Sequence, residues 1–412
     1  MSTFDVVEIC AGAGGQALGL EKAGFDHALA VELDANACNT LRANRSTWKI
    51  AEGDVADESV WRPSDYHGVS LLAGGVPCPP FSIAGKQLGA NDERDLFAWA
   101  VEQVAVIQPR ALLLENVRGL SMPRFAGYRQ HVIDRLTQLG YIAEWRLLQA
   151  SDYGVPQLRP RFILVALKPD DALYFRWPDP VGTPPTVGET LVDLMGSDGW
   201  RGAYAWSRKA NRIAPTIVGG SKKHGGADLG PTRAKRAWAE IGVDALGVAD
   251  APPPASAQTD FVPKLTCEMV APIQGWSGNY PWTFAGRKTA RYRQIGNAFP
   301  PPVAHSVGAA IIRAFHHQGD QQTLEVAAHA PLYLALRSSK DFMTPESLMK
   351  IAGLNDPAEL ERQIGLLSRD FEVEIKTSGP RTGYKLGDFN AFVGQEDHDR
   401  HTLFLKHRAR IS

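Results

Sequence analysis

The chain has 412 residues, 44% of them hydrophobic and 22% charged, and its formal net charge is −1. This composition is typical of a globular protein with two or three domains, and it excludes a global positive field that would draw the chain to nucleic acid. No apolar run reaches the length of a membrane span and the N-terminus has no signal-peptide pattern, so we expect a cytoplasmic protein without membrane contact.

The four cysteines lie far apart and form no CxxC pair. This spacing argues against a zinc site and against a disulfide framework. We therefore expect reduced thiols and no metal site. The cysteines are Cys10, Cys38, Cys78 and Cys267.

Residues 1–168 alternate short apolar segments with helical ones. Such alternation predicts an α/β fold with a doubly wound, mostly parallel sheet. The expected strands are FDVVEI (4–9), ALAVEL (28–33), VSLLAG (69–74), ALLLEN (111–116) and RFILVAL (161–167), and the expected helices cover 16–23, 35–44, 96–107 and 128–139.

The strand and helix pattern stops near Lys168. Residues 169–262 are rich in Gly and Pro, which predicts a separate, loop-rich domain. Within it, residues 201–236 hold nine Lys or Arg and one acidic residue, a local basic patch of the kind that contacts phosphates. A regular helix is expected again at 303–317.

The end of the first strand predicts a cofactor site. Strand 4–9 runs into a glycine-rich turn at 10–15, where the backbone can approach a ligand closely. Glu32 ends the next strand and can accept hydrogen bonds from ribose hydroxyls, and Asp54 follows the third. No phosphate-binding GK[ST] follows, which favours an adenosine-type cofactor without a pyrophosphate.

Chemistry-bearing residues lie at the ends of three further strands: Cys78 after 69–74, Glu115 at the end of 111–116, and Arg159 and Arg161 where 161–167 begins. Cys78 stands between prolines on a stiffened loop, where ligands bind in this fold, whereas the other cysteines are better read as buried apolar residues. Glu115 ends strand 111–116 and points into the same cleft. Arg159 and Arg161 alternate by two, so an extended segment would direct both to one face.

Six ordered motifs resemble those of bacterial DNA (cytosine-5)-methyltransferases of the restriction-modification type. The resemblance covers about residues 1–318, and it implies a transferase that uses S-adenosyl-L-methionine to methylate double-stranded DNA. The motifs are EICAGAGG (8–15), GGVPCPPFS (74–82), ENV (115–117), QLRPR (157–161), the segment 264–276 and QIGNAFPP (294–301).

The resemblance implies four catalytic residues. Cys78 would attack C6 of a flipped-out cytosine, which makes C5 nucleophilic enough to accept a methyl group. Glu115 would bind the N3 and N4 edge of the base, Arg161 would hold O2, and Arg159 would support the nucleophile loop.

The resemblance also implies a cofactor-binding set. Cys10 and Leu33 stand where the family carries aromatic residues, so weaker adenine stacking is expected, with a contribution from Leu96. The set consists of Cys10, Ala11, Gly12, Gly14, Gly15, Glu32, Leu33, Asp54, Val55, Pro77, Leu96, Asn297 and Ala298.

The domain roles follow from the same resemblance. Residues 1–168 form the catalytic domain, completed by 263–318, and residues 169–262 form the target-recognition domain. The recognised DNA sequence does not follow from these residues. The expected DNA contacts are Ser82, Lys222, Lys223, His224, Arg233, Lys235 and Arg236.

Residues 319–412 lie outside the resemblance and form an accessory domain. Two short helices at 343–353 and 358–370 precede a possible hairpin, an order that resembles a winged helix. The same pattern is compatible with a simple packing appendage.

Two other functions compete with this interpretation. An RNA cytosine methyltransferase would have a smaller recognition region than 169–262. A DNA-binding regulator with a silent catalytic domain would not need Cys78, Glu115 and Arg161 together. We therefore expect a monomeric, nucleoid-associated enzyme that is paired with a restriction endonuclease.

Overall fold

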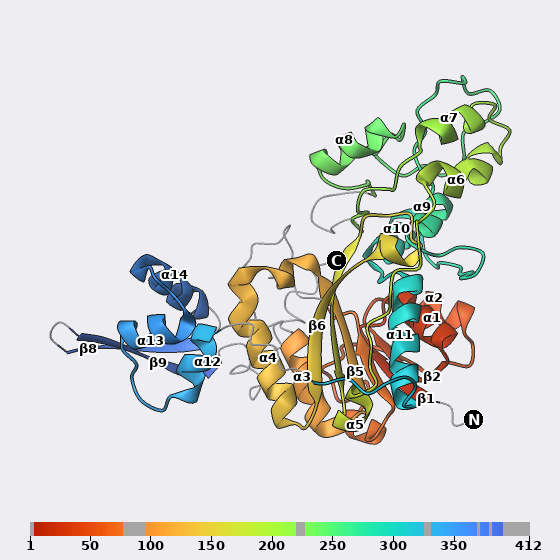
Figure 1. The fold of residues 1–412 in the computed structure, drawn as a ribbon. Coiled ribbons are helices and arrows are strands. Elements are labelled where there is room, and N and C mark those ends of the chain that lie inside the picture. Colours follow the sequence, from red (N-terminus) through yellow and green to blue (C-terminus); the bar gives the residue numbers. More distant parts are fainter. Residues whose placement is uncertain are drawn as a thin grey trace.

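A seven-stranded sheet forms the centre of the computed structural model, which describes residues 4–76, 96–219, 227–324, 331–368, 371–378 and 381–389 (Figure 1). The strand order is β3-β2-β1-β4-β5-β7-β6, and β7 alone runs antiparallel to its neighbours. The predicted mostly parallel sheet is thus confirmed. Its strands are β1 (Phe4–Ile9), β2 (Phe25–Glu32), β3 (Ile50–Glu52), β4 (Leu71–Gly74), β5 (Ala111–Val117), β6 (Ile142–Gln149) and β7 (Pro160–Leu167).

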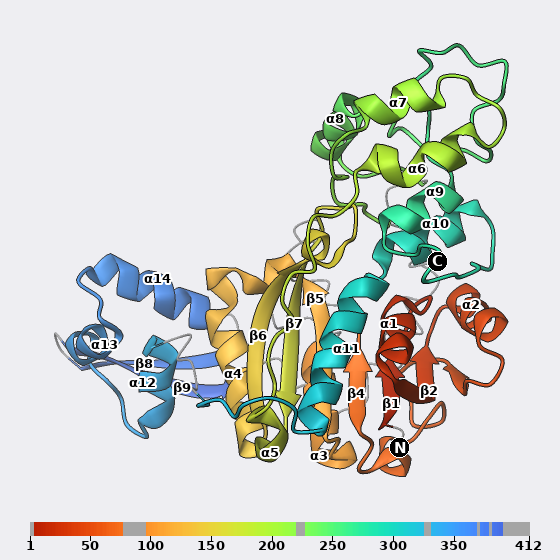
Figure 2. The same cartoon turned by 45° about the vertical axis from the view of Figure 1, so that its right-hand side comes forward.

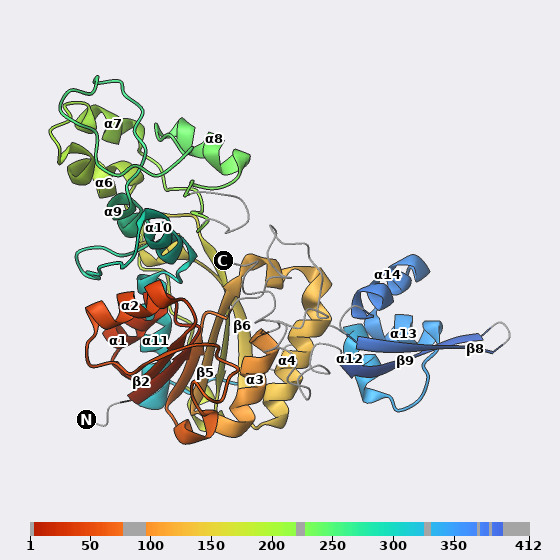
Figure 3. The ribbon, with the colours of Figure 1, turned by 180° about the vertical axis from the view of Figure 1, so that it is seen from behind.

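Helices cover both faces of the sheet because successive strand residues point to opposite sides. Val7 and Leu72 face a core that includes α3 (Leu96–Ile107) and α4 (Ala126–Gln138). Figure 3 shows both helices beside the sheet, seen from behind. Val6 and Leu71 face the opposite core, which includes α11 (Pro301–Phe315). Helices α1 (Gly15–Ala23) and α11 pack closely, since a side chain at Gly19 would lie 2.5 Å from Pro301 O.

In the target region, residues 169–262, the helices from residue 187 onward stand above the end of the sheet toward which β4 points, whereas α5 (Pro169–Ala172) lies at the opposite end (Figure 2). Its core is shared with residues from later in the chain, including Met269 and Ile295. Two helices of 263–318 thus pack into the core of the target region, whereas α11 packs on the sheet. The helices concerned are α6 (Val187–Gly196), α7 (Ala203–Lys209), α8 (Thr232–Glu240), α9 (Cys267–Ile273) and α10 (Lys288–Asn297).

Smaller elements complete the description. The side chain of Asp34 caps α2 by accepting from two backbone N–H groups, so α2 starts directly after β2. None of the helices among the described residues is long and apolar enough to cross a membrane. The remaining helices are α2 (Ala35–Asn44), α5 (Pro169–Ala172), α12 (Pro331–Ser338), α13 (Pro345–Ala352) and α14 (Pro357–Leu367).

The accessory unit, residues 331–389 as far as they are described, packs beside α4 on the side away from the target region (Figure 1). Helices α13 and α14 and the hairpin of β8 (Phe371–Ser378) and β9 (Arg381–Phe389) lie close to where the sequence places two helices and a hairpin. The likeness to a winged helix stays a prediction. Leu367 approaches Gly127 of α4 so closely that a side chain there would meet it at 2.6 Å.

His131 of α4 lies in this contact. Its Nδ1 is 3.4 Å from the Tyr333 hydroxyl and its ring stands edge-on to Phe371, with ring centroids 5.4 Å apart. Burial, with Arg337 and Arg135 nearby, lowers the pKa of His131 from 6.5 to about 3. The folded protein therefore holds this imidazole neutral at pH values where the unfolded chain protonates it.

Acidification should therefore weaken the fold through His131. The pKa of His131 is lower in the folded protein than in the unfolded chain. The stability that the neutral imidazole contributes is therefore fully present above pH 6.5 and is lost as the pH drops toward 3. Between pH 7.5 and 5.5 we expect a loss of roughly 1 kcal/mol in the free energy of unfolding. Denaturant titrations at both pH values should show a smaller loss in His131→Gln. Equal losses in both proteins would contradict the prediction.

Candidate active site

The glycine-rich turn between β1 and α1 has an unusual backbone. Cys10, Gly12 and Gly14 all have left-handed φ values, of 51°, 55° and 88°. A side chain at Gly14 would lie 2.7 Å from the Trp282 ring, and one at Gly15 would lie 2.4 Å from Phe299 O. These contacts explain the glycines, and they bring residues from the end of the catalytic domain against its first turn.

Glu32 ends β2 beside this turn. Its carboxylate accepts hydrogen bonds from the backbone N–H groups of Gly12 and Asp34, both at 2.7 Å. Burial raises the pKa of Glu32, and these two hydrogen bonds oppose the shift. A side chain at Gly12 would meet nothing within 4 Å, so open space lies in front of this turn.

Further residues of the predicted cofactor set lie around the same strand ends. The Asp54 carboxylate accepts from the N–H of Ala56 at 2.9 Å, and Val55 is buried. Leu33, directly after Glu32, leaves 44% of its surface exposed. Asn297 is exposed at the end of α10.

Glu115 and Arg161 meet on neighbouring strands. Val117 of β5 pairs with Arg161 of β7 in the antiparallel ladder, and Arg161 Nε lies 2.5 Å from Glu115 Oε1. Both side chains are about nine-tenths buried. Burial raises the pKa of Glu115, opposed by the charges of Arg161 and Arg159. A carboxyl in this setting retains its proton to higher pH than an exposed one.

The start of the predicted nucleophile loop lies against this pair. A side chain at Gly75 would lie 3.5 Å from Glu115 Oε2, and the Asn116 side chain donates to Val76 O at 3.4 Å. The chain therefore passes Glu115 directly before residue 77. Pro77, Cys78 and Ser82 lie outside the described residues.

Arg159 is buried, and its side chain binds backbone. Its guanidinium donates to Ile217 O, Gly296 O and Ala298 O at 2.8–3.0 Å. Burial lowers its pKa well below the usual value, with Arg161 adding to the effect. Arg159 thus joins the target region to the end of α10.

The three described thiols are held in their protonated form. Burial raises the pKa of Cys10, Cys38 and Cys267, and Glu32 adds to the shift at the first two. None of them has the electropositive, accessible setting that activates a cysteine. This agrees with reading them as residues without a nucleophilic role.

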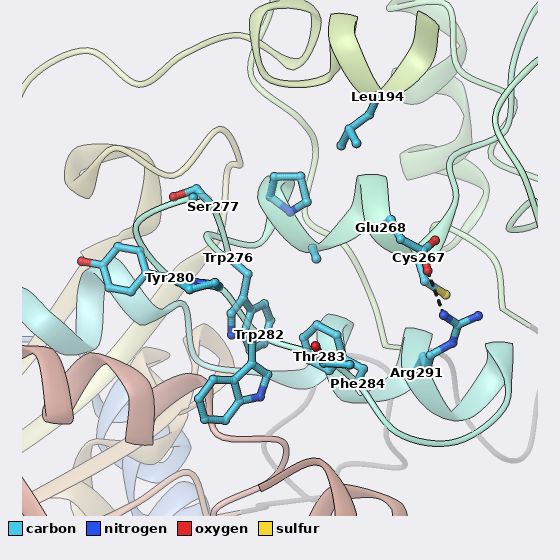
Figure 4. A pocket seen from close by; sticks show the side chains of 14 residues that line it. Leu194, Cys267, Glu268, Trp276, Ser277, Tyr280, Trp282, Thr283, Phe284 and Arg291 are labelled. Atoms are coloured by element: carbon cyan, nitrogen blue, oxygen red, sulfur yellow. Dashed lines mark hydrogen bonds and ion pairs between the residues drawn. The ribbon is translucent and has the colours of Figure 1, made fainter. Parts of the chain in front are cut away.

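A hollow of about 440 Å³ lies between α6, α9 and the aromatic segment 276–284 (Figure 4). An ion pair between Glu268 and Arg291 of 2.8 Å crosses its wall. None of the predicted catalytic residues among the described ones lines it. Its Trp282 does reach the cofactor turn, since the indole N–H donates to Ala13 O at 2.7 Å.

The basic residues of the target region fall into two groups. Arg233 and Arg236 are exposed on α8, while Lys235 pairs with Asp228 at 2.8 Å. Lys222, Lys223 and His224 lie outside the described residues, so their expected DNA contacts stay predictions.

Comparison with known proteins decides the family. The model of the family described as C-5 cytosine-specific DNA methylase matches residues 4–313. The chain belongs to this family. It is a DNA (cytosine-5)-methyltransferase, as the six motifs indicate.

Named relatives agree. This methyltransferase is 66% identical to Type II methyltransferase M.NaeI of Lentzea aerocolonigenes, over the full length of both chains. It is 50% identical to M.NgoMIV of Neisseria gonorrhoeae, over 76% of this chain and 98% of the relative. The match to M.NgoMIV therefore leaves about a quarter of this chain without a counterpart.

Solved structures support the fold of this methyltransferase. A Spodoptera frugiperda DNMT2 mutant matches with a TM-score of 0.52 at 16% identity, over 75% of this chain and 99% of that one. The S. pombe Dnmt2 methyltransferase gives a TM-score of 0.51 at the same identity, over 76% and 99%.

Some residues of the site were not singled out from the sequence. Gln16 is buried directly after the glycine-rich turn, Trp282 donates to that turn, and Tyr292 donates to the target region, yet nothing in their spacing indicates these positions. Gln16 follows the glycine run directly, and Tyr292 precedes the 294–301 motif by two positions. Their proximity to a motif is therefore the only feature of the sequence that could have indicated Gln16 and Tyr292.

Proposed function

We propose that this methyltransferase transfers a methyl group from S-adenosyl-L-methionine to C5 of a flipped-out cytosine in double-stranded DNA, through a covalent bond between Cys78 and C6. The observation that carries the proposal is the buried Glu115–Arg161 pair, 2.5 Å apart, which lies beside Gly75, three residues before Cys78. A polar pair in this setting suits the Watson–Crick edge of one base.

The residues of the chain divide the reaction into steps. The Cys78 thiolate adds to C6 while Glu115, protonated more readily because of its burial, donates to N3, so electron density moves to C5. Arg161 donates to O2 and stabilises the charge that develops on the ring. After methylation a base takes the C5 proton, the Cys78–C6 bond breaks to restore the 5,6 double bond, and N3 returns its proton to Glu115.

The residues around the glycine turn fit the cofactor. Space opens in front of Gly12, and both side-chain amide atoms of the buried Gln16 lack a partner among the described residues, which favours a polar ligand beside them. Glu32 and Asp54 would hold the adenosine part, and Asn297 and Ala298 the remainder. When bound, this cofactor supplies an electrophilic methyl group.

Glu32→Ala should weaken cofactor binding about tenfold to hundredfold, because it removes charge-assisted hydrogen bonds to the ribose. The same change frees the N–H groups of Gly12 and Asp34, so the turn should also lose order. Calorimetry with S-adenosylhomocysteine measures the affinity. Glu52→Ala, which removes an exposed carboxylate at the end of β3, is the control. Equal affinities in the two variants would place the cofactor elsewhere.

Arg233 and Arg236 are exposed where α8 can meet phosphates, and we assign Ser82, Lys222, Lys223 and His224 to the same duplex.

The Type II relatives support pairing with a restriction endonuclease, whose cleavage the methyl group would block. We further propose that the enzyme is a monomer that works at the nucleoid in the cytoplasm, with residues 319–412 as an accessory domain.

Bisulfite sequencing of DNA from a host that expresses the chain tests the function. We expect 5-methylcytosine at one short sequence throughout the genome, and none in a host that expresses Cys78→Ala. Methylation confined to RNA, or methyl groups on N4 of cytosine or N6 of adenine, would contradict the proposal.

A further inference from the structure

A stretch of positive charge follows the strand end that carries Glu115. Between Glu115 and Asp134 the chain has three arginines and no carboxylate. The first part of this stretch forms two short turns of 3-10 helix, Arg118–Ser121 and Pro123–Phe125, and we call residues 118–125 the ridge. Figures 1 and 3 show the segment between β5 and α4 at the same end of the sheet as α8. The arginines are Arg118, Arg124 and Arg129.

Arg129 of α4 holds the ridge through its backbone. The guanidinium donates from Nη1 to Leu120 O and to Met122 O, both at 2.8 Å, and lies 5.8 Å from the centre of the Phe162 ring. Burial lowers the pKa of Arg129 from 12.5 to about 10. The two carbonyls satisfy hydrogen bonds of this cation but do not neutralise its charge, so a partly desolvated positive charge lies under the ridge.

Arg118, the first residue of the ridge, is exposed. The Ser121 hydroxyl donates to Arg118 O at 2.8 Å, which closes the turn and leaves the guanidinium in solvent. Neither Arg118 nor Arg129 forms an ion pair with a carboxylate in the described part of the chain. Arginines elsewhere do so: Arg45, Arg110 and Arg135 each bind a carboxylate at 2.5–2.7 Å. A basic surface without counter-ions of its own suits a polyanion.

We propose that the ridge is a DNA-contacting surface of the catalytic domain, in which Arg118 binds a backbone phosphate beside the target cytosine and Arg129 is the positioning residue that holds the turn. The inference rests on the proposed function, because that function places the edge of the flipped cytosine at Glu115. Arg118 stands three residues after Glu115, a separation of at most about 10 Å. The phosphate therefore lies within one nucleotide of the target.

A phosphate contact positions the duplex and carries no sequence information. Arg118→Gln tests this, because it removes one charge from an exposed side chain, and Arg118→Lys keeps that charge. Arg62→Gln is the matched control, since Arg62 is also exposed but stands before the turn Pro63–Tyr66 on the amino side of β4. The substrates are a duplex with the site found by bisulfite sequencing and the same duplex with one base pair changed. Affinities are measured over a range of salt concentrations.

We expect Arg118→Gln to weaken both duplexes equally, by about threefold to fivefold, the range for one exposed ion pair. The slope of log affinity against log salt should fall by about 0.9, the value for one phosphate contact, and Arg118→Lys should restore it. KM for DNA should change more than kcat. Altered discrimination between the duplexes would mean that Arg118 reads a base, and behaviour equal to Arg62→Gln would mean that the ridge does not touch DNA. Either result would overturn the inference.

Duplexes with one neutral methylphosphonate linkage locate the contact. Each phosphate around the target cytosine is replaced in turn, and the affinities of the wild type and Arg118→Gln are compared. A neutral linkage beside the target should weaken the wild type and leave Arg118→Gln unchanged, because the contact is already lost. If no position shows this coupling, Arg118 binds no phosphate. A wild-type enzyme that methylates no cytosine in DNA would instead overturn the proposed function.

The role of Arg129 is tested by a double-variant cycle. Arg129→Gln should raise KM for DNA, since the carbonyls at 120 and 122 lose their donor and the turn that presents Arg118 loosens. In the double variant it should add little to Arg118→Gln, because both changes act on one contact. Additive losses, with both proteins folded by circular dichroism, would show that Arg129 does not position Arg118.

Discussion

Cys78→Ala should abolish methyl transfer, with a loss on the order of 10⁴-fold or more, because no other group in the proposed site can add to C6. A duplex with 5-fluorocytosine at the target shows this directly. Fluorine cannot leave C5 as a proton does, so the bond between Cys78 and C6 stays intact after methylation. Wild-type protein should form a denaturation-resistant complex, and Cys78→Ala none.

Cys267→Ala is the matched control for this experiment. Cys267 is buried at the wall of the 276–284 hollow, and burial raises its pKa, so its thiol takes no part in the reaction. The control should form the complex as the wild type does. A stable complex in Cys78→Ala would assign the nucleophile to another residue and end the proposed mechanism.

Glu115→Gln should lower kcat about 10²- to 10³-fold, because an amide can contact the base edge but cannot give a proton to N3. The pH profile distinguishes this role from a structural one. Burial raises the pKa of Glu115, so the wild-type rate should fall as pH rises through that value, while thiolate formation at Cys78 raises the rate from the acid side. Glu115→Gln should lack the fall at high pH.

Asp171→Asn controls for the loss of a buried carboxylate. Asp171 is as buried as Glu115 and pairs with Arg110 at 2.6 Å, at the amino end of β5 instead of its carboxyl end. We expect a loss of stability with the wild-type pH profile. If Asp171→Asn and Glu115→Gln show the same profile, Glu115 acts only through folding.

In the accessory unit, the sequence predicts the helices and the hairpin but not how they pack. The positions of α13, α14 and the hairpin follow from local periodicity, and the structure agrees with them. Their packing against α4 through Leu367 and Gly127 does not follow, because complementarity between distant surfaces leaves no periodic signal.

The sequence by itself determined the mostly parallel sheet, most of its strands and the family, since hydrophobic period and short motifs are local properties. Strand β6 was not among the expected strands. It also placed Glu115 and Arg161 at strand ends. That these two lie 2.5 Å apart was decided only by the antiparallel pairing of β5 with β7, which no spacing along the chain encodes.

The contacts between the target region and α10 were decided by tertiary structure alone. Arg159, expected beside the nucleophile loop, donates to carbonyls at 217, 296 and 298, and Tyr292 joins 218 to 228. Backbone carbonyls are identical in every residue, so a side chain that binds them leaves no trace in the partner's sequence. Such contacts become visible only when the chain is folded and distant segments meet.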